Sequence, residues 1–196
     1  MCTEITRKTF SSTITCVFKS GDSHLFENYR PISVLPIFSK FIEKLVTIRL
    51  YTHFLNCNIL TPSQFGYRED LSTLDAVNSI VDFLYGSFDR KKKVIGVFVD
   101  LSKAFDCLDR RKILLKLSQY GVTGTALSWF KSYFLNRRQF VNYDGVSSSV
   151  SEVGYGIAQG SILSPLLFAL MMNDLPDKIA SKLNVYADDI CFTSPG

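Results

Sequence analysis

Two adjacent carboxylates, Asp188 and Asp189, are the side chains of this sequence best suited to chemistry. The flanking residues, 185–186 and 190–192, have the apolar and aromatic composition of two short buried strands, which places the acidic pair at the tip of a tight hairpin. Neighbouring carboxylates repel each other unless a cation neutralises them. Since carboxylate oxygens are hard ligands, the pair predicts a site for Mg²⁺ or Mn²⁺ that the phosphates of a substrate would share.

A third carboxylate, Asp100, follows an apolar run at residues 94–99 (VIGVFV) that predicts a strand buried on both faces. Carboxylates at the ends of two buried strands can converge. Asp100 and Asp188 would then hold two ions, one that activates an attacking hydroxyl and one that steadies a leaving phosphate. Either motif alone is better explained by a turn or a helix cap. The two motifs together, with the segment that lies between them, favour the metal site.

The segment between these carboxylates, residues 154–168, joins glycines and a glutamine to an apolar stretch. Gly160 would let a nucleotide approach the backbone closely. Leu163, Leu166 and Leu167 recur at helical spacing. We therefore expect a glycine-containing loop followed directly by a helix.

Three segments of the chain resemble motifs A, B and C of reverse transcriptases, specifically those of non-LTR (LINE-type) retrotransposons. They are residues 99–106 (VDLSKAFD), 159–161 (QGS) and 186–189 (YADD). Further segments resemble that family in the same order, and they are residues 18–22, 28–33, 64–68 with 72–73, and 124–133. A single short motif recurs by chance, whereas an ordered set spread over residues 17–194 is specific.

The resemblance implies an α+β polymerase right hand with fingers and palm, in which an antiparallel palm sheet packs on helices. We expect the fingers at residues 1–93 and the palm at residues 94–196, with the thumb absent because the sequence stops soon after Asp189. The resemblance also implies template-directed DNA synthesis from dNTPs. Its cofactor would be Mg²⁺ (or Mn²⁺), and its partners would be an RNA template and a DNA primer.

The resemblance assigns the metal site residue by residue. Asp100 and Asp188 would bind both ions, and the carbonyl of Leu101 would complete one coordination shell. Asp189 would add negative charge nearby, although a purely structural role explains it nearly as well. All three aspartates would thus form the catalytic group.

The resemblance also implies a set of residues around the incoming nucleotide. Because phosphoryl transfer depends on charge neutralisation, Lys19 and Arg30 would meet the triphosphate. Without the resemblance they would be a surface lysine and an arginine in a turn. Phe105 would lie under the sugar and exclude a 2′-hydroxyl, or on periodicity alone would be a core aromatic. Gln159 and Gly160 would border the nucleotide.

On the template side, the resemblance implies contacts from Gln64, Gly66 and Arg68. Ala158 departs from the family, which usually has a proline there, and the change removes a restraint on φ ahead of the glutamine. Two hypotheses for the function follow. The chain is an RNA-directed DNA polymerase, or it is a catalytically inactive retrotransposon-derived remnant that binds nucleic acid or has no independent function.

Composition limits the class of protein. The 196 residues are 46% hydrophobic and 20% charged, enough for a real core, and the net charge of +4 is only mildly basic. Basic runs at 90–93, 110–112 and 137–138 suit a phosphate backbone, but such runs are more often solvated faces, which is the better explanation for 90–93. Five scattered cysteines predict neither disulfides nor zinc, hence an intracellular location, nuclear or cytoplasmic. We expect no membrane association, because apolar stretches are short.

Local signals predict most of the helices and turns. A helix begins near Pro36 with one apolar side, made of Phe38, Phe41, Ile42, Leu45 and Ile48. Ser72 and Asp75 form a capping box ahead of a second helix. Asp109 caps a third, which ends at Gly121, and a fourth covers 125–135. A hairpin over residues 138–153 turns at 144–145.

Overall fold

The computed structural model describes residues 12–195, which form two compact units. Within the described residues, unit 1 comprises 12–50 and 105–164, and unit 2 comprises 51–104 and 165–195. Each unit contains chain from both sides of residue 93, so neither coincides with a division into 1–93 and 94–196. The assignment of those two ranges to fingers and palm stays a prediction, and each unit is described on its own.

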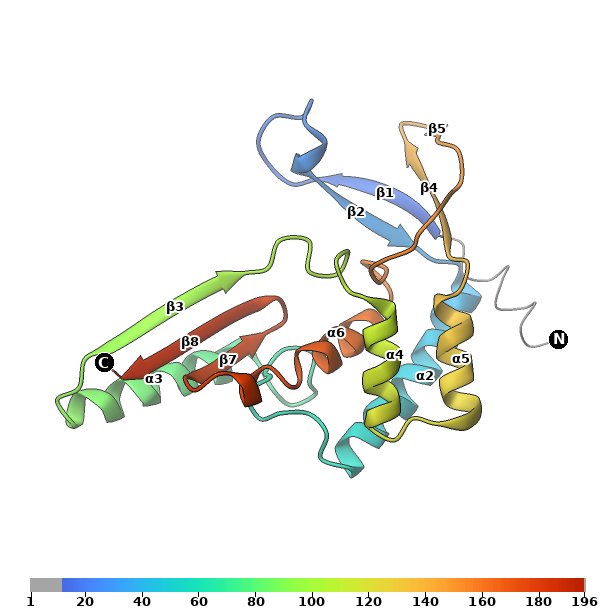
Figure 1. Cartoon of the computed structure of the whole chain (residues 1–196). Coiled ribbons are helices and arrows are strands. Elements are labelled where there is room, and N and C mark those ends of the chain that lie inside the picture. The colour runs from blue at the N-terminus through green and yellow to red at the C-terminus, as the bar shows by residue number, and fades with distance from the viewer. Residues whose placement is uncertain (1–11, 196) are drawn as a thin grey trace. The chain divides into compact units, whose positions relative to one another are not determined.

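The sheet of unit 2 has three antiparallel strands in the order β3-β8-β7 (Figure 1). They are β3 (Val94–Asp100), β7 (Lys182–Tyr186) and β8 (Asp189–Pro195). A two-residue loop, Ala187 and Asp188, joins β7 to β8, and Ala187 adopts a left-handed φ of 57°. The predicted hairpin is confirmed. Asp188 lies in its loop, and Asp189 is the first residue of β8.

Helices pack on both faces of this sheet. One face buries Leu183, Val185 and Ile190, with Met172 at the end of α6 (Ser164–Met172) packed against them. The other face packs against α3 (Thr73–Asp89). One contact there is a hydrogen bond from the Lys182 Nζ to the Ser79 carbonyl oxygen at 2.6 Å. Since side chains alternate between faces along a strand, each strand serves both layers. A short 3-10 helix, η2 (Pro176–Lys178), follows α6.

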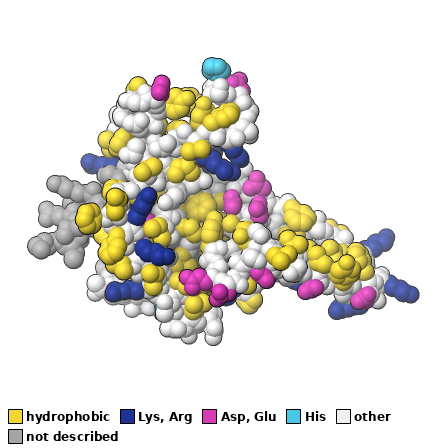
Figure 2. Space-filling view, turned by 180° about the vertical axis from the view of Figure 1, so that it is seen from behind, with side chains coloured by type: hydrophobic (Ala, Val, Ile, Leu, Met, Phe, Trp, Pro, Cys, Tyr) yellow, Lys and Arg dark blue, Asp and Glu magenta, His cyan; other side chains and the backbone are white. Residues whose placement is uncertain are grey.

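The prediction that residues 94–99 are buried on both faces is wrong. β3 pairs only with β8 in the part of the chain that the structure describes, and Phe98 is 77% exposed. Figure 2 shows hydrophobic side chains gathered on the surface of the part that carries α3 and this sheet. An apolar run indicates the composition of a strand but not whether other elements cover it. The sequence of β3 is therefore typical of a central strand, although β3 lies at the edge of this sheet.

Unit 1 contains a mixed sheet in the order β2-β1-β4-β5, with β6 paired to β4. Its strands are β1 (Ser12–Phe18), β2 (Tyr29–Val34), β4 (Arg138–Tyr143), β5 (Val146–Ser147) and β6 (Ser151–Glu152). β1 and β4 are parallel, and the other pairs are antiparallel. The turn between β4 and β5 falls at Asp144 and Gly145 as predicted, both with positive φ. A 3-10 turn, η1 (Phe26–Asn28), precedes β2.

The helices of unit 1 follow the predicted boundaries. α4 (Arg110–Gln119) begins where the Asp109 carboxylate accepts from the Arg111 backbone N–H at 2.8 Å, and it is followed by Gly121 with φ 86°. α5 (Gly124–Phe134) packs beside it (Figure 1). Ile113, Leu117 and Tyr133 are fully buried there. The capping box of α3 in unit 2 is also confirmed, with both reciprocal hydrogen bonds present.

Helix α2 (Ile37–Asn56) forms where predicted, but its apolar side faces outward. Phe38 is 79% exposed, and Phe41, Leu45 and Ile48 are also exposed, whereas Ser39 and Glu43 have no accessible surface. A helical stripe of apolar residues normally faces a core. The polar partners of Glu43, described below, explain why the opposite side is buried.

Candidate active site

The pairing of β3 with β8 places Asp100 directly opposite Asp189. Directly opposite residues on antiparallel strands have Cα atoms about 4.5–5.5 Å apart, and their side chains lie on the same face. Asp188 immediately precedes Asp189 and lies in the hairpin loop. The structure therefore gathers the three predicted acidic residues at one end of the sheet in unit 2.

These carboxylates lack neutralising partners. Within residues 12–195, the side chains of Asp100, Asp188 and Asp189 make no hydrogen bond or ion pair with another side chain or the backbone. Like charges directly opposite each other in a sheet are destabilising. Burial raises the pKa of the nearby Tyr67 hydroxyl, and the negative charge of Asp188 raises that pKa further. The acidic end of the sheet therefore favours a bound cation.

The donor set suits a divalent metal that substrate helps to hold. Among the described residues, no three His, Cys, Asp or Glu side chains are grouped closely enough to hold a metal by themselves. Mg²⁺ needs fewer protein ligands, because it keeps waters and is commonly bound by one or two carboxylates plus substrate phosphates. Asp100 and the adjoining acidic pair fit that requirement. Leu101 follows Asp100, and its side chain packs against the buried core of the sheet.

A cavity of about 400 Å³ lies between α3 and the sheet of unit 2. Asp100 and Asp189 both line it, and most of its other lining side chains are apolar, among them Ala76, Val77 and Phe98. Both carboxylates are solvent-exposed, so the acidic end of the sheet is open to a cation from solution.

Gly66 supports the loop that carries Asp188. The Phe65 backbone N–H donates to the Val185 carbonyl, and the Val185 N–H donates to the Ser63 carbonyl, both at 2.8 Å. A Cβ added to Gly66 would lie only 2.2 Å from the backbone nitrogen of Ala187. A glycine is therefore needed for the chain to pass this close to the loop.

The other two residues predicted to contact template lie around the same segment. Gln64 is 1% exposed, and its amide oxygen and nitrogen have no hydrogen-bond partner in the described part of the chain. The Arg68 Nη1 donates to the Thr61 carbonyl at 3.1 Å and to the Gln64 carbonyl at 3.4 Å. Both residues thus belong to the support of the hairpin, and a contact with template stays a prediction.

The residues predicted to surround the nucleotide lie in unit 1. The Ser33 N–H in β2 donates to the Gln159 carbonyl at 2.7 Å. Gly160 has φ 102°, and a Cβ there would lie 3.0 Å from the Ser33 carbonyl oxygen. Gly160 is therefore required for close packing against β2. Lys19 and Arg30 are exposed and belong to the β1–β2 hairpin, where Arg30 pairs with Val17.

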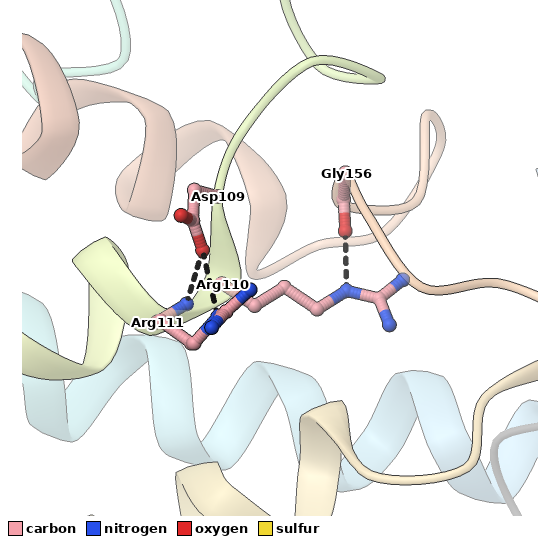
Figure 3. Close-up of polar contacts among 4 residues, drawn as sticks. All are labelled: Asp109, Arg110, Arg111 and Gly156. Atoms are coloured by element: carbon pink, nitrogen blue, oxygen red, sulfur yellow. Dashed lines mark hydrogen bonds and ion pairs between the residues drawn. The ribbon is translucent and has the colours of Figure 1, made fainter.

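Phe105 is half-buried, and its carbonyl accepts from the Ile157 N–H at 2.9 Å. Arg110, the first residue of α4, holds the same loop in place. Its Nε donates to the Gly156 carbonyl at 2.7 Å (Figure 3), and its Nη atoms donate to the carbonyls of Phe134, Val153 and Tyr155. Burial lowers the pKa of Arg110 to about 10. The sequence offered no signal for this role beyond a short basic run.

A buried carboxylate holds the segment after Gly160, and sequence reasoning missed it. Glu43 in α2 accepts from the Tyr133 hydroxyl at 2.7 Å, and from the Ser161 hydroxyl and the Ile162 N–H, each at 2.9 Å. Burial raises the pKa of Tyr133 to about 12. The Ser161 Oγ also accepts from the Leu163 N–H at 3.2 Å. The sequence signal was that Glu43 is the single acidic residue of α2.

The predicted site residues thus fall into two groups. Unit 2 brings together Asp100, Leu101, Asp188, Asp189, Gln64, Gly66 and Arg68. Unit 1 holds Lys19, Arg30, Phe105, Gln159 and Gly160. No helix in the described part of the chain is long and apolar enough to cross a membrane.

Comparison with known proteins identifies the family of this chain. A family model described as "Reverse transcriptase (RNA-dependent DNA polymerase)" matches residues 18–196. The chain is 32% identical over 171 residues to "Probable RNA-directed DNA polymerase from transposon X-element" of Drosophila melanogaster, covering 85% of this chain and 19% of that protein. It is 29% identical over 188 residues to "RNA-directed DNA polymerase from mobile element jockey" of the same species, covering 91% and 20%. The chain therefore spans about a fifth of the length of these relatives.

Solved structures show the same fold. A telomerase from Candida tropicalis in complex with a fragment of telomeric RNA has a TM-score of 0.69 at 14% identity, covering 96% of this chain and 36% of that one. The apo telomerase of the same species has a TM-score of 0.62 at 12% identity, covering 95% and 39%. At these identities the likeness concerns the fold alone. The predicted α+β right-hand polymerase fold is confirmed.

Proposed function

Because this chain belongs to the reverse transcriptase (RNA-dependent DNA polymerase) family, in the lineage of LINE-type retrotransposons, we propose that it is the polymerase core of an RNA-directed DNA polymerase. The observation that carries the proposal is the opposed pair Asp100 and Asp189, with Asp188 in the adjoining loop. In the proposed reaction, the 3′-hydroxyl oxygen of a DNA primer bonds to the α-phosphorus of a dNTP. Pyrophosphate leaves, and an RNA template selects the dNTP by base pairing.

Asp100, Asp188 and the carbonyl of Leu101 would hold two Mg²⁺ or Mn²⁺ ions. Bound there, the ions would lower the pKa of the primer hydroxyl and neutralise charge on the leaving pyrophosphate. The chain itself contributes position. β3 and β8 hold Asp100 and Asp189 opposite each other, which supports Asp189 as a source of further negative charge at the site.

The residues of unit 1 would receive the nucleotide. Lys19 and Arg30 are exposed on one hairpin, so both cations are free to meet the triphosphate. Phe105 has its backbone fixed by Ile157, and its ring would exclude a ribose 2′-hydroxyl by volume. Gln159, hydrogen-bonded to β2, would border the nucleotide together with Gly160. Gln64, Gly66 and Arg68 would lie near the template.

Primer extension on an RNA template tests the proposal. The wild-type chain with Mg²⁺ and dNTPs should extend a DNA primer, and Asp100→Asn and Asp188→Asn should each abolish extension. Asp82→Asn is the matched control, because Asp82 is an exposed aspartate on α3 of the same unit. It should extend the primer as the wild type does.

The result also separates the two hypotheses for the function. Extension that survives in Asp100→Asn and Asp188→Asn contradicts the assignment of these carboxylates. A wild-type chain that binds RNA but extends no primer favours the alternative, a non-catalytic module that binds nucleic acid.

A further inference from the structure

Unit 1 contains a cavity of about 420 Å³, within the size range of small-ligand sites. Its walls come from β1, β2 and β4 and from the loop at residues 153–159. Three arginines line it, Arg110, Arg137 and Arg138, against two acidic residues, Asp106 and Glu152. The cavity therefore carries an excess of positive charge.

Arg137 is the unusual member of this group. It is only 5% exposed, and its Nη1 and Nη2 have no hydrogen-bond partner in the described part of the chain. Arg110 shows the contrast, because its guanidinium donates to four backbone carbonyls, one of them Gly156 in Figure 3. Buried charged groups whose N–H donors have no acceptor are costly. Arg137 therefore lacks the hydrogen-bond acceptors that Arg110 has.

The carboxylates around Arg137 are engaged elsewhere. Glu152 pairs with Arg138 at 3.3 Å on the surface. Both carboxylate oxygens of Glu43 accept hydrogen bonds, from Tyr133, Ser161 and the Ile162 N–H. Asp106 has interactions of its own. Within residues 12–195, none of these carboxylates therefore accepts a hydrogen bond from the Arg137 Nη atoms.

Packing holds the Arg137 guanidinium in place. Its central carbon lies 5.0 Å from the centre of the Tyr133 ring, and that ring is completely buried. Stacking on an aromatic face orients the planar fork of an arginine, which is the shape that matches a phosphate with two parallel hydrogen bonds. A fixed fork next to a cavity is suited to bind an anion with little loss of entropy.

We propose that this cavity is a phosphate-binding site in which Arg137 provides the fork. The site is separate from the triphosphate contact proposed for Arg30. Side chains alternate along β2, and Pro31 and Ser33 line the cavity, so Arg30 projects from the opposite face of that strand. The identity of the phosphate rests on the proposed function: it belongs either to the backbone of a bound nucleic acid or to a free nucleotide. The experiments below distinguish these two sources.

The wild-type chain carries its own reporter of the site. Trp129 is its single tryptophan, and its ring is stacked on Tyr133 with centroids 5.2 Å apart. Titration with sodium phosphate should give a saturable change in tryptophan fluorescence, and sodium chloride at equal ionic strength should give none. No difference between the two salts would overturn the proposal.

Variants locate the binding. Arg137→Met should abolish the phosphate-dependent change without lowering the melting temperature, because it removes an unpaired buried charge. Arg111→Gln is the control, since that side chain is 85% exposed in the same unit, and it should bind phosphate as the wild type does. If Arg137→Met does not fold, Arg137→Lys decides the matter, because it keeps the charge and loses the fork. Phosphate affinity unchanged in the folded variant overturns the proposal.

Two further probes identify the source of the phosphate. For a nucleic-acid backbone, Arg137→Met should weaken binding of a 12-nucleotide single-stranded RNA about tenfold and lower the slope of log affinity against log salt by about one. For a free nucleotide, the same variant should instead weaken binding of a dNTP. Equal losses in Arg137→Met and Arg111→Gln would overturn the site. None of these readouts needs polymerase activity, so failure of this proposal and failure of the proposed function are distinguishable.

Discussion

Replacing Gly66 with alanine tests whether the close contact between Gly66 and the Ala187 backbone stabilises the loop that carries Asp188. The new Cβ would lie 2.2 Å from the Ala187 nitrogen, where ordinary contacts begin at 3.4 Å, so the loop and the Gly66 segment must separate by about 1 Å. Gly66 does not have a left-handed φ, so this contact alone demands glycine. Overpacking of this kind costs about 1–3 kcal/mol.

Separation would also strain the hydrogen bonds on either side of Val185, each worth about 1 kcal/mol. We therefore expect Gly66→Ala to lower the free energy of unfolding by about 2–4 kcal/mol. Urea denaturation of the variant and the wild type at the same pH measures this difference. The affinity for Mn²⁺ should fall as well, because the loop that carries Asp188 moves.

Gly86→Ala is the matched control. Gly86 lies within α3 of the same unit, and the nearest atom to its added Cβ is the far end of Arg90 at 4.0 Å. In a helix interior this change should stabilise the protein by roughly 0.5–1 kcal/mol. If Gly66→Ala unfolds at the same urea concentration as the wild type, the account of the hairpin's support is refuted.

Three other predictions concern unit 1. Glu43→Gln should cost about 2 kcal/mol of unfolding free energy in urea, because an amide cannot accept all three hydrogen bonds, whereas Lys44→Gln on the exposed side of α2 should cost little. Burial raises the pKa of Tyr133 to about 12, above the value near 10 in an unfolded chain, so folding stability should fall as the pH rises from about 10 to 12, and Tyr133→Phe should show a smaller fall in the same denaturation series. Phe105→Val should relax discrimination against rNTPs in primer extension. A sharply lower melting temperature with unchanged selectivity would instead make Phe105 a core residue.

Local signals in the sequence were sufficient for the elements that carry the site. The cap at Asp109, the capping box at Ser72 and the hairpin around Asp188 each involve residues within a few positions of one another, and each formed as predicted. The ordered motifs were also enough to identify the family. These signals describe short-range hydrogen bonding and turn geometry, which depend only on residues close together in the sequence.

Contacts between distant segments could not be predicted in the same way. The outward apolar side of α2 follows from Glu43, whose partners Tyr133 and Ser161 lie far along the chain. The contact between Gly66 and Ala187 likewise depends on how two remote segments meet. Pairing of β3 with β8 then set Asp100 opposite Asp189, a register that no local pattern contains. The template contacts, the two-metal arrangement and the intracellular location stay predictions.

Calorimetric titration with Mn²⁺ tests the central claim most directly, because it measures the acidic end of the sheet without requiring a primer or a template. The wild-type chain should bind Mn²⁺, and Asp100→Asn and Asp188→Asn should each bind it more weakly while keeping the wild-type melting temperature or exceeding it, since each relieves repulsion between carboxylates. Asp82→Asn should bind as the wild type does. Unchanged Mn²⁺ affinity in both Asp100→Asn and Asp188→Asn would contradict the claim that these carboxylates form the metal site.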